Sequence, residues 1–258
     1  MKILFIGDIV GAPGREAVKK LLPGLKKEFA LDFAIANAEN AAGGSGVTLK
    51  VAEELFAAGL DVLTSGDHIW KKKEIFEFIN GEGRLLRPLN FPTGAPGRGW
   101  GLFKAKNTPV GVINVNGRVF MEALDCPFRT SRQAQEELSE DAKIIIVDIH
   151  AEATSEKVAL GWYLDGKVSA VLGTHTHIQT ADEKILPNGT AYITDVGMTG
   201  AYDSVIGRRV EDVLERFLTA VPVRFEVAEG NVQLHAVVLD IEENSGKARS
   251  IIRIQKKL

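Results

Sequence analysis

Short apolar runs alternate with helical patterns along most of this chain, and this alternation predicts an α/β fold. The runs are rich in Val, Ile and Leu, which is typical of strands that are buried on both faces of a sheet. Strands are predicted at residues 2–6, 31–36, 61–64, 110–115, 142–149, 168–172 and 192–194. Helices are predicted at residues 15–29, 48–58 and 71–80, from residue 154 onward, and near residues 210–220.

Thr48 is expected to cap the helix that comes after it. The segments outside these helices and strands are less regular. Repeated prolines and glycines between residues 81 and 111 predict surface loop and edge strand. Residues 232–241 and 248–255 alternate as antiparallel strands do, and we expect them to cover or extend the second sheet. Because the sequence has no internal repeat or linker, we predict a single domain over residues 1–258.

Composition narrows the class of protein. A formal charge of −3 and a pI near 6.0 indicate no basic face, so duplex DNA binding is not expected. The apolar start of the chain ends at Gly7, too early for a signal peptide or a membrane span. The single cysteine, Cys126, excludes an internal disulfide and favours a reducing compartment. We therefore expect a cytoplasmic protein that does not contact membranes.

Carboxylates follow the first three predicted strands. The glycines at positions 7, 11 and 14 suggest a dinucleotide-binding loop, but Asp8 would place a negative charge where a pyrophosphate should lie, and it suits a cation better. Glu39 and Asn40 offer oxygen ligands after the second strand, and Asp67 and His68 follow the third. Taken alone, each of these residues is more readily explained as a turn or helix-capping residue.

Imidazoles follow two later strands. His150 ends the most apolar run, and His175 and His177 follow the run at 168–172. In an extended chain alternate residues point the same way, so His175 and His177 should face one cavity. Asp195 is a candidate partner for an imidazole N–H. Arg118 is either a phosphate-binding residue or an exposed salt-bridge arginine, and His235 is assigned to structure.

All of these metal-binding residue types lie just beyond predicted strands, where open α/β sheets bind ligands. Four of the five histidines belong to the set, which chance placement would not favour. The set is too large for one zinc ion and suits two cations that share a carboxylate. We therefore predict a metal site built from these residues: Asp8, Glu39, Asn40, Asp67, His68, His150, His175 and His177.

Taken together, the motifs resemble the calcineurin-like metallophosphoesterase superfamily and, within it, the YmdB-type phosphodiesterases. They span nearly the whole chain, and their order and spacing are specific. The matching segments are Gly7-Asp8, Ala38-Glu39-Asn40-Ala41-Ala42-Gly43-Gly44, Gly66-Asp67-His68, His150-Ala151-Glu152-Ala153-Thr154-Ser155-Glu156-Lys157, Gly173-Thr174-His175-Thr176-His177 and Thr194-Asp195-Val196-Gly197-Met198-Thr199-Gly200.

The resemblance implies a four-layer αββα sandwich, with two mixed β-sheets flanked by helices, and a centre of two divalent or trivalent ions such as iron or manganese. It implies that Glu39 bridges the ions, and that His68 remains as proton donor. It implies two further ligand sets, Asp8, Asn40 and His177 for one ion, and Asp67, His150 and His175 for the other. The family pattern has Asn where this chain has Asp67, and the extra negative charge should favour harder or more highly charged metals.

The function expected from the resemblance is hydrolysis of phosphodiesters, with 2',3'- or 3',5'-cyclic nucleotides as candidate substrates. Attack is expected from a hydroxide held between the two ions, with His68 protonating the leaving alkoxide. Short RNA ends are possible substrates, because they could enter the same cleft without a basic patch. A homo-oligomer is compatible with the sequence.

Two other functions remain open on the sequence. One is an amidohydrolase-like hydrolase on a β/α barrel, although its His-x-His motif would be expected after the first strand, where this chain has Asp8. The other is a non-catalytic protein that binds metal or nucleotide as a regulator. Metal content together with diester and amide hydrolysis would separate the three hypotheses.

Overall fold

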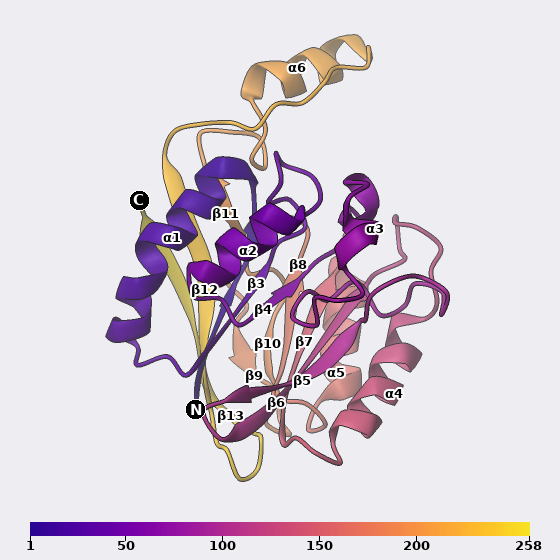
Figure 1. Cartoon of the computed structure of the whole chain (residues 1–258), viewed down its shortest axis with the longest axis vertical. Coiled ribbons are helices and arrows are strands. Elements are labelled where there is room, and N and C mark those ends of the chain that lie inside the picture. Colours follow the sequence, from indigo (N-terminus) through magenta and orange to yellow (C-terminus); the bar gives the residue numbers. More distant parts are fainter.

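The computed structural model describes residues 1–258 and contains two β-sheets packed face to face between outer layers of helices (Figure 1). The predicted four-layer αββα sandwich is therefore confirmed. Because both sheets are open, the β/α barrel of the amidohydrolase hypothesis is wrong. None of the helices has the length and hydropathy needed to cross a bilayer.

The first sheet has seven strands in the order β2-β11-β12-β1-β3-β4, with β13 paired to β12. The first, third and fourth strands of the chain run parallel, so their carboxyl ends meet at one edge. The bounds are β1 Lys2–Ile6, β2 Asp8–Ile9, β3 Phe33–Asn37, β4 Val62–Thr64, β11 Met198–Ala201, β12 Val232–Ile241 and β13 Ala248–Lys257.

The second sheet has six strands in the order β5-β6-β7-β8-β10-β9. Its central strands β6, β7, β8 and β10 are parallel and end at the same side of the molecule as β1, β3 and β4. The bounds are β5 Trp100–Ala105, β6 Thr108–Asn116, β7 Ile144–His150, β8 Ala170–Thr174, β9 Lys184–Ile185 and β10 Ala191–Ile193.

Three apolar cores hold the layers together. A cluster of 20 buried residues fills the space between the sheets, and includes Phe5, Ile35 and Ile146. A cluster of 27 packs α1 and α2 on the first sheet, and one of 14 packs α4 and α5 on the second. The helices are α1 Gly11–Glu28, α2 Leu49–Ala57, α3 Ile75–Phe78, α4 Pro127–Leu138, α5 Thr154–Leu164 and α6 Val210–Thr219, with a 3₁₀ turn at Ile69–Lys71.

Several predicted elements differ from the structure. The helix predicted at 71–80 is broken, because Lys72 is extended and lets Ile69 and Ile75 both reach the core. The helix predicted at 15–29 already begins at Gly11, with Pro13 in the first turn. Proline is tolerated there, because a backbone N–H in the first turn has no hydrogen-bond partner within the helix. The last two strands, β12 and β13, extend the first sheet rather than the second. Helix α4 and strand β11 were not predicted.

The helix predicted near 210–220 is present as α6, but it does not cover a sheet. It projects from the body as a separate arm that residues 202–209 and 220–228 connect to the first sheet (Figure 1). Val213 is the only buried residue of this helix. The arm therefore lies outside the four layers.

Candidate metal centre

Strand ends from both sheets bring the predicted ligands to one place. Asp8 lies on β2, and the other residues lie at or directly after β3, β4, β7 and β8. Their imidazole and carboxylate groups form two clusters in which the candidate ligand atoms lie within 4.8 Å of one another. The clusters are Glu39, Asp67, His150 and His175, and Asp8, Glu39 and His177. Glu39 belongs to both.

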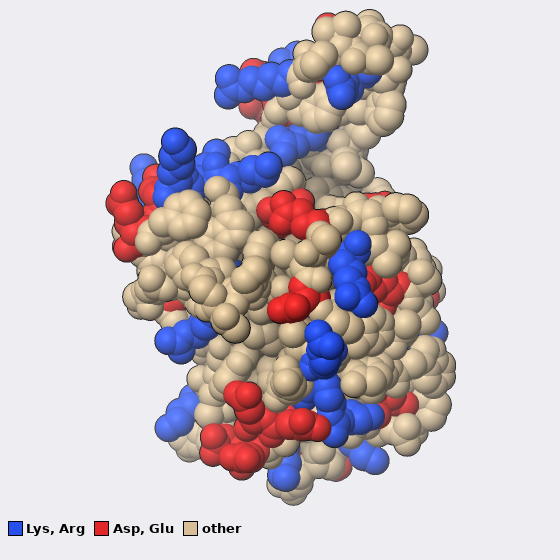
Figure 2. Space-filling view, turned by 90° about the vertical axis from the view of Figure 1, so that its right-hand side faces the viewer, with Lys and Arg blue, Asp and Glu red and all other residues tan.

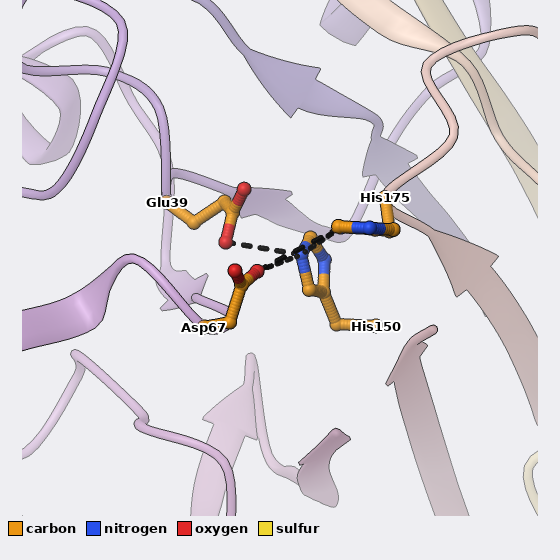
Figure 3. Close-up of side chains that lie close together, drawn as sticks. All are labelled: Glu39, Asp67, His150 and His175. Carbon is orange, nitrogen blue, oxygen red and sulfur yellow. Dashed lines mark hydrogen bonds and ion pairs between the residues drawn. The ribbon is translucent and has the colours of Figure 1, made fainter. Parts of the chain in front are cut away.

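In the first cluster four side chains point toward a common centre (Figure 3). His150 Nε2 lies 3.0 Å from Glu39 Oε2 and 3.3 Å from Asp67 Oδ1. His175 Nδ1 lies 3.0 Å from the same His150 nitrogen. Gly66 makes this approach possible, since a Cβ atom there would overlap the Glu39 carboxylate and the His150 ring.

In the second cluster His177 Nε2 lies 3.8 Å from Asp8 Oδ1. Asn40 lies beside this pair, with its amide nitrogen 3.2 Å from His177 Nε2 and 2.7 Å from Glu39 Oε1. Its amide oxygen faces His68 Nδ1 at 2.9 Å. For Asn40 to serve as an oxygen ligand, its side-chain amide must therefore flip so that the oxygen faces the cluster.

The donor atoms fit a cation. Asp8 Oδ1 and Asp67 Oδ1 are buried atoms without a hydrogen-bond partner, which is costly for a carboxylate unless a positive charge is close by. His150 Nε2 also faces His175 Nδ1 at 3.0 Å, in addition to the carboxylates of Glu39 and Asp67. Carboxylate oxygens and imidazole nitrogens together are ligands suited to zinc, iron and manganese. These residues could hold metal ions.

The backbone of the His-x-His segment is not extended, contrary to the prediction. Strand β8 ends at Thr174, and His175 and His177 have φ values of 99° and 67°, a region that residues other than glycine rarely adopt. Both rings nevertheless reach the clusters. Local strain of this kind is common at functional sites.

Hydrogen bonds to groups outside the two clusters orient the imidazole rings. His177 Nδ1 lies 2.9 Å from the Ile206 carbonyl, to which it donates. His150 Nδ1 lies 2.9 Å from Thr174 Oγ1, whose own hydrogen goes to Asp148 Oδ1 at 2.8 Å. Partners of this type set which ring nitrogen carries the proton and which is free to bind metal.

Asp195 does not contact an imidazole, so its predicted role is wrong. It accepts hydrogen bonds from Lys157 Nζ at 2.9 Å and from the backbone and hydroxyl of Thr176 at 3.0 and 2.7 Å. Lys157 is fully buried, so the pair anchors the segment between His175 and His177 to α5. Asp195 thus acts on the loop backbone.

Burial and mutual charge shift the pKa values of the site. Burial raises the pKa of Asp8. Burial also acts to raise the pKa of Glu39, but the charges and hydrogen bonds of His150 and His68 together outweigh it and hold that pKa well below the ordinary value. The hydrogen bond to Glu39 raises the pKa of His68. Burial, with the charge of His150, lowers the pKa of His175 to about 4.

A cleft of about 270 Å³ opens over the clusters and is lined by Glu39, His68, His175 and His177 among others. Arg208 also lines it, whereas Arg118 does not and is exposed instead. The Arg208 guanidinium donates to the carbonyls of Gly44 and Phe225 and has no carboxylate partner. Sequence patterns did not indicate Arg208, because it follows no predicted strand.

Known proteins resemble this chain over its full length. The 2',3'-cyclic-nucleotide 2'-phosphodiesterase of Bacillus subtilis (strain 168) is 53% identical over 254 residues, which are 98% of this chain and 96% of that protein. A crystal structure of a hypothetical protein from Thermus thermophilus is 44% identical, with a TM-score of 0.94 and coverage of 100% and 99%. A novel phosphatase of Mycoplasma pneumoniae is 36% identical, with a TM-score of 0.93 and coverage of 100% and 93%.

The layered fold, the clustered acids and histidines, and these relatives define an enzyme, a hydrolase of phosphoric esters of the metallophosphoesterase type. The model of one family within that class, described as YmdB-like protein, matches residues 4–254. This chain belongs to the YmdB-like family. The family predicted from the motifs is therefore confirmed.

Proposed function

We propose that this enzyme is a metal-dependent phosphodiesterase that hydrolyses 2',3'-cyclic nucleotides by breaking the bond to the 2'-oxygen. The observation that carries the proposal is the pair of ligand clusters that share Glu39 below one open cleft. The name of the Bacillus subtilis relative supports the choice of substrate. A five-membered cyclic phosphate is a compact anion, compatible with a cleft of about 270 Å³.

Two ions are assigned to the two clusters. Asp8, Glu39 and His177 would hold one ion, with Asn40 after its amide turns over. The other ion would be held by Glu39, Asp67, His150 and His175. When bound, a pair of ions in such a site neutralises phosphate oxygens and activates a water for in-line attack.

His68 is the proton donor in this proposal. Its side chain lies at the edge of the cleft and is 30% exposed, so it can reach a substrate above the clusters. The hydrogen bond to Glu39 raises its pKa and favours the protonated ring. A ribose 2'-oxygen is a poor leaving group, and a proton delivered to it as the P–O bond breaks lowers the barrier.

Arg208 is proposed to bind the phosphate, in place of Arg118. It contributes a guanidinium to a cleft otherwise lined by acids, histidines and neutral residues. Its bonds within the chain go to carbonyl oxygens and not to a carboxylate, so its charge is not neutralised there. A planar guanidinium can donate two parallel hydrogen bonds to a phosphate.

Asp67 bears on which metal is bound. With Asp8, Glu39 and Asp67, the two clusters hold three carboxylates, and Asp67 Oδ1 has no hydrogen-bond partner. Additional anionic oxygen favours harder or more highly charged ions, so iron or manganese is proposed rather than a soft metal. The family pattern with Asn would give a site with one negative charge fewer.

The proposal is tested with purified protein that is stripped by a chelator and reloaded with Mn²⁺ or Fe²⁺ under anaerobic conditions. Elemental analysis should find two ions per chain, and 2',3'-cyclic adenosine monophosphate should be converted to the 3'-phosphate. Parallel assays with 3',5'-cyclic nucleotides, short RNA ends and bis-p-nitrophenyl phosphate define the substrate range. Two bound ions without cleavage of any diester would favour a non-catalytic metal-binding role instead.

A further inference from the structure

The cleft over the ligand clusters has one hydrophobic side chain, that of Ile206, and all other residues that line it are charged or polar. Ile206 is 48% exposed and lies at the base of the arm, which joins the body through a narrow neck (Figure 2). Its carbonyl accepts the hydrogen bond from His177 Nδ1 at 2.9 Å. The residue therefore lies directly beside the cluster that contains His177.

Ile206 occupies a backbone position that disfavours its own side chain. Val205 and Arg208 are joined by two backbone hydrogen bonds of 2.9 Å, one in each direction, which enclose a two-residue turn. The central residues, Ile206 and Gly207, have φ values of 46° and 91°. Positive φ at both positions defines a type I′ turn, for which Asn-Gly, Asp-Gly and Gly-Gly are the preferred pairs. A β-branched residue is a steric outlier at the first of these positions.

The turn itself does not require an isoleucine. Its close packing on the first sheet depends on Gly207, where a Cβ atom would come within 2.8 Å of Val10 Cγ1. The hydrogen bond to His177 uses the backbone carbonyl of Ile206, which any residue would supply. An asparagine would keep both features with less backbone strain. Strained residues are common where a ligand is bound, so the isoleucine side chain points to a contact within the cleft.

We propose that Ile206 contacts the face of the substrate's nucleobase, an inference that rests on the proposed function, in which a cyclic nucleotide enters the cleft. The phosphate is drawn to the ligand clusters and to Arg208, two residues further along the same turn. The base is the part of the nucleotide that has apolar faces, and contact with Ile206 removes apolar surface of both from water. Because every base has such a face, Ile206 favours nucleotides over base-free phosphates without distinguishing among bases.

Calorimetry with manganese-loaded protein tests the contact without turnover. Two ligands are compared: adenosine 3'-monophosphate, and methyl β-D-ribofuranoside 3-phosphate, which carries the same sugar phosphate but no base. Wild-type protein should bind the nucleotide more tightly. Ile206→Asn should bind the nucleotide about 3- to 10-fold more weakly, the effect of returning half of an isoleucine side chain to water. Its affinity for the base-free phosphate and its manganese content should match those of the wild type.

Two further variants are controls. Ile206→Leu keeps an apolar side chain and should retain most of the affinity for the nucleotide. Ile252→Asn alters an isoleucine of nearly equal exposure, 49%, on β13 outside the cleft, and it should bind both ligands as the wild type does.

The two ligands also separate this contact from the proposed reaction. A wild type that binds both ligands equally, or an Ile206→Asn variant that weakens both or neither, would overturn the inference. Cleavage of 2',3'-cyclic adenosine monophosphate is measured separately on the same protein. If the wild type prefers the nucleotide, and Ile206→Asn abolishes that preference, but no cyclic nucleotide is cleaved, the proposed function fails while the contact stands.

Discussion

Replacing Asp148 with Asn is expected to weaken the metal site without changing any side chain that faces the cleft. Asp148 is fully buried on β7 and joins the two sheets. Its carboxylate accepts hydrogen bonds from Asn37 Nδ2 at 2.9 Å, Thr64 Oγ1 at 2.5 Å and Thr174 Oγ1 at 2.8 Å. Burial raises its pKa to about 6, so it is largely ionised at neutral pH.

An amide cannot accept all three of these bonds. If its nitrogen replaces Oδ2, it faces the Asn37 amide nitrogen, donor against donor. If its nitrogen replaces Oδ1, the Thr174 hydroxyl must turn and donate to His150 Nδ1, which moves the ring proton to Nε2. That nitrogen faces Glu39 and Asp67, and once protonated it cannot bind a metal ion.

Both orientations of the amide in Asp148→Asn predict a weaker metal site. Losing a partner that orients a metal-bound histidine typically costs 10- to 100-fold in metal affinity, equivalent to about 1.4–2.7 kcal/mol. A buried donor left without an acceptor costs about 1–3 kcal/mol of unfolding free energy. Metal affinity should therefore fall by roughly 10- to 100-fold, and activity should recover substantially when metal is added in excess.

Titration of metal-free protein with Mn²⁺, followed by calorimetry and by activity, measures the loss. The matched control is Asp240→Asn, which alters a partly buried carboxylate paired with Lys2 at 2.7 Å on β12. The control should bind metal as the wild type does. Wild-type metal affinity and activity in Asp148→Asn would refute the view that the Thr174 hydroxyl sets the His150 tautomer.

Three further changes have defined outcomes. His68→Asn should lower turnover of 2',3'-cyclic nucleotides by about 10²- to 10⁴-fold and that of bis-p-nitrophenyl phosphate much less, because nitrophenolate leaves without a proton. Arg208→Ala should raise KM for cyclic nucleotides about tenfold or more, the effect of one lost charged hydrogen bond, and Arg208→Lys should recover part of it. His235→Gln should remove an acid-induced loss of unfolding free energy, since burial lowers the pKa of His235 to about 4.

The sign and size of the His235 effect follow from linkage. The pKa of His235 is 6.5 in the unfolded chain and about 4 in the folded protein. Protonation of the unfolded chain therefore lowers the free energy of unfolding as the pH falls below 6.5, and this loss levels off below about pH 4. The full loss is about 3 kcal/mol. Urea unfolding between pH 4 and 7 measures it, and identical pH profiles for wild type and variant would contradict the assignment.

Matched measurements separate the two cleft variants from general damage. His68→Asn should keep wild-type metal content, and an equal loss on alkyl and aryl esters would argue against proton donation. Arg118→Ala is the control for Arg208→Ala, because Arg118 is exposed away from the cleft. If both arginine variants kept the wild-type KM, Arg208 would not bind the phosphate.

Sequence patterns determined the α/β class of the fold and the residues with metal-binding chemistry, and the family resemblance of the motifs implied the four layers. Apolar runs mark buried strands, and parallel strands bring the residues at their carboxyl ends to one edge of the sheet. The convergence of Asp8, Glu39 and His150 could therefore be expected from the order of residues along the chain. Local signals also located the Thr48 cap, whose hydroxyl accepts from Val51. They failed at residues 71–80, where burial of Ile69 and Ile75 overrides helical periodicity.

Only the tertiary structure decided how these groups are supported and what surrounds them. In the sequence Asp148 is only one more position of an apolar strand. The structure shows that its carboxylate accepts hydrogen bonds from Asn37 and Thr64 of the other sheet. Arg208 enters the cleft from the base of an arm whose position no local pattern encodes. Hydrophobic periodicity reports which face of an element is apolar, but the partner of that face, or its absence on α6, depends on contacts between distant segments.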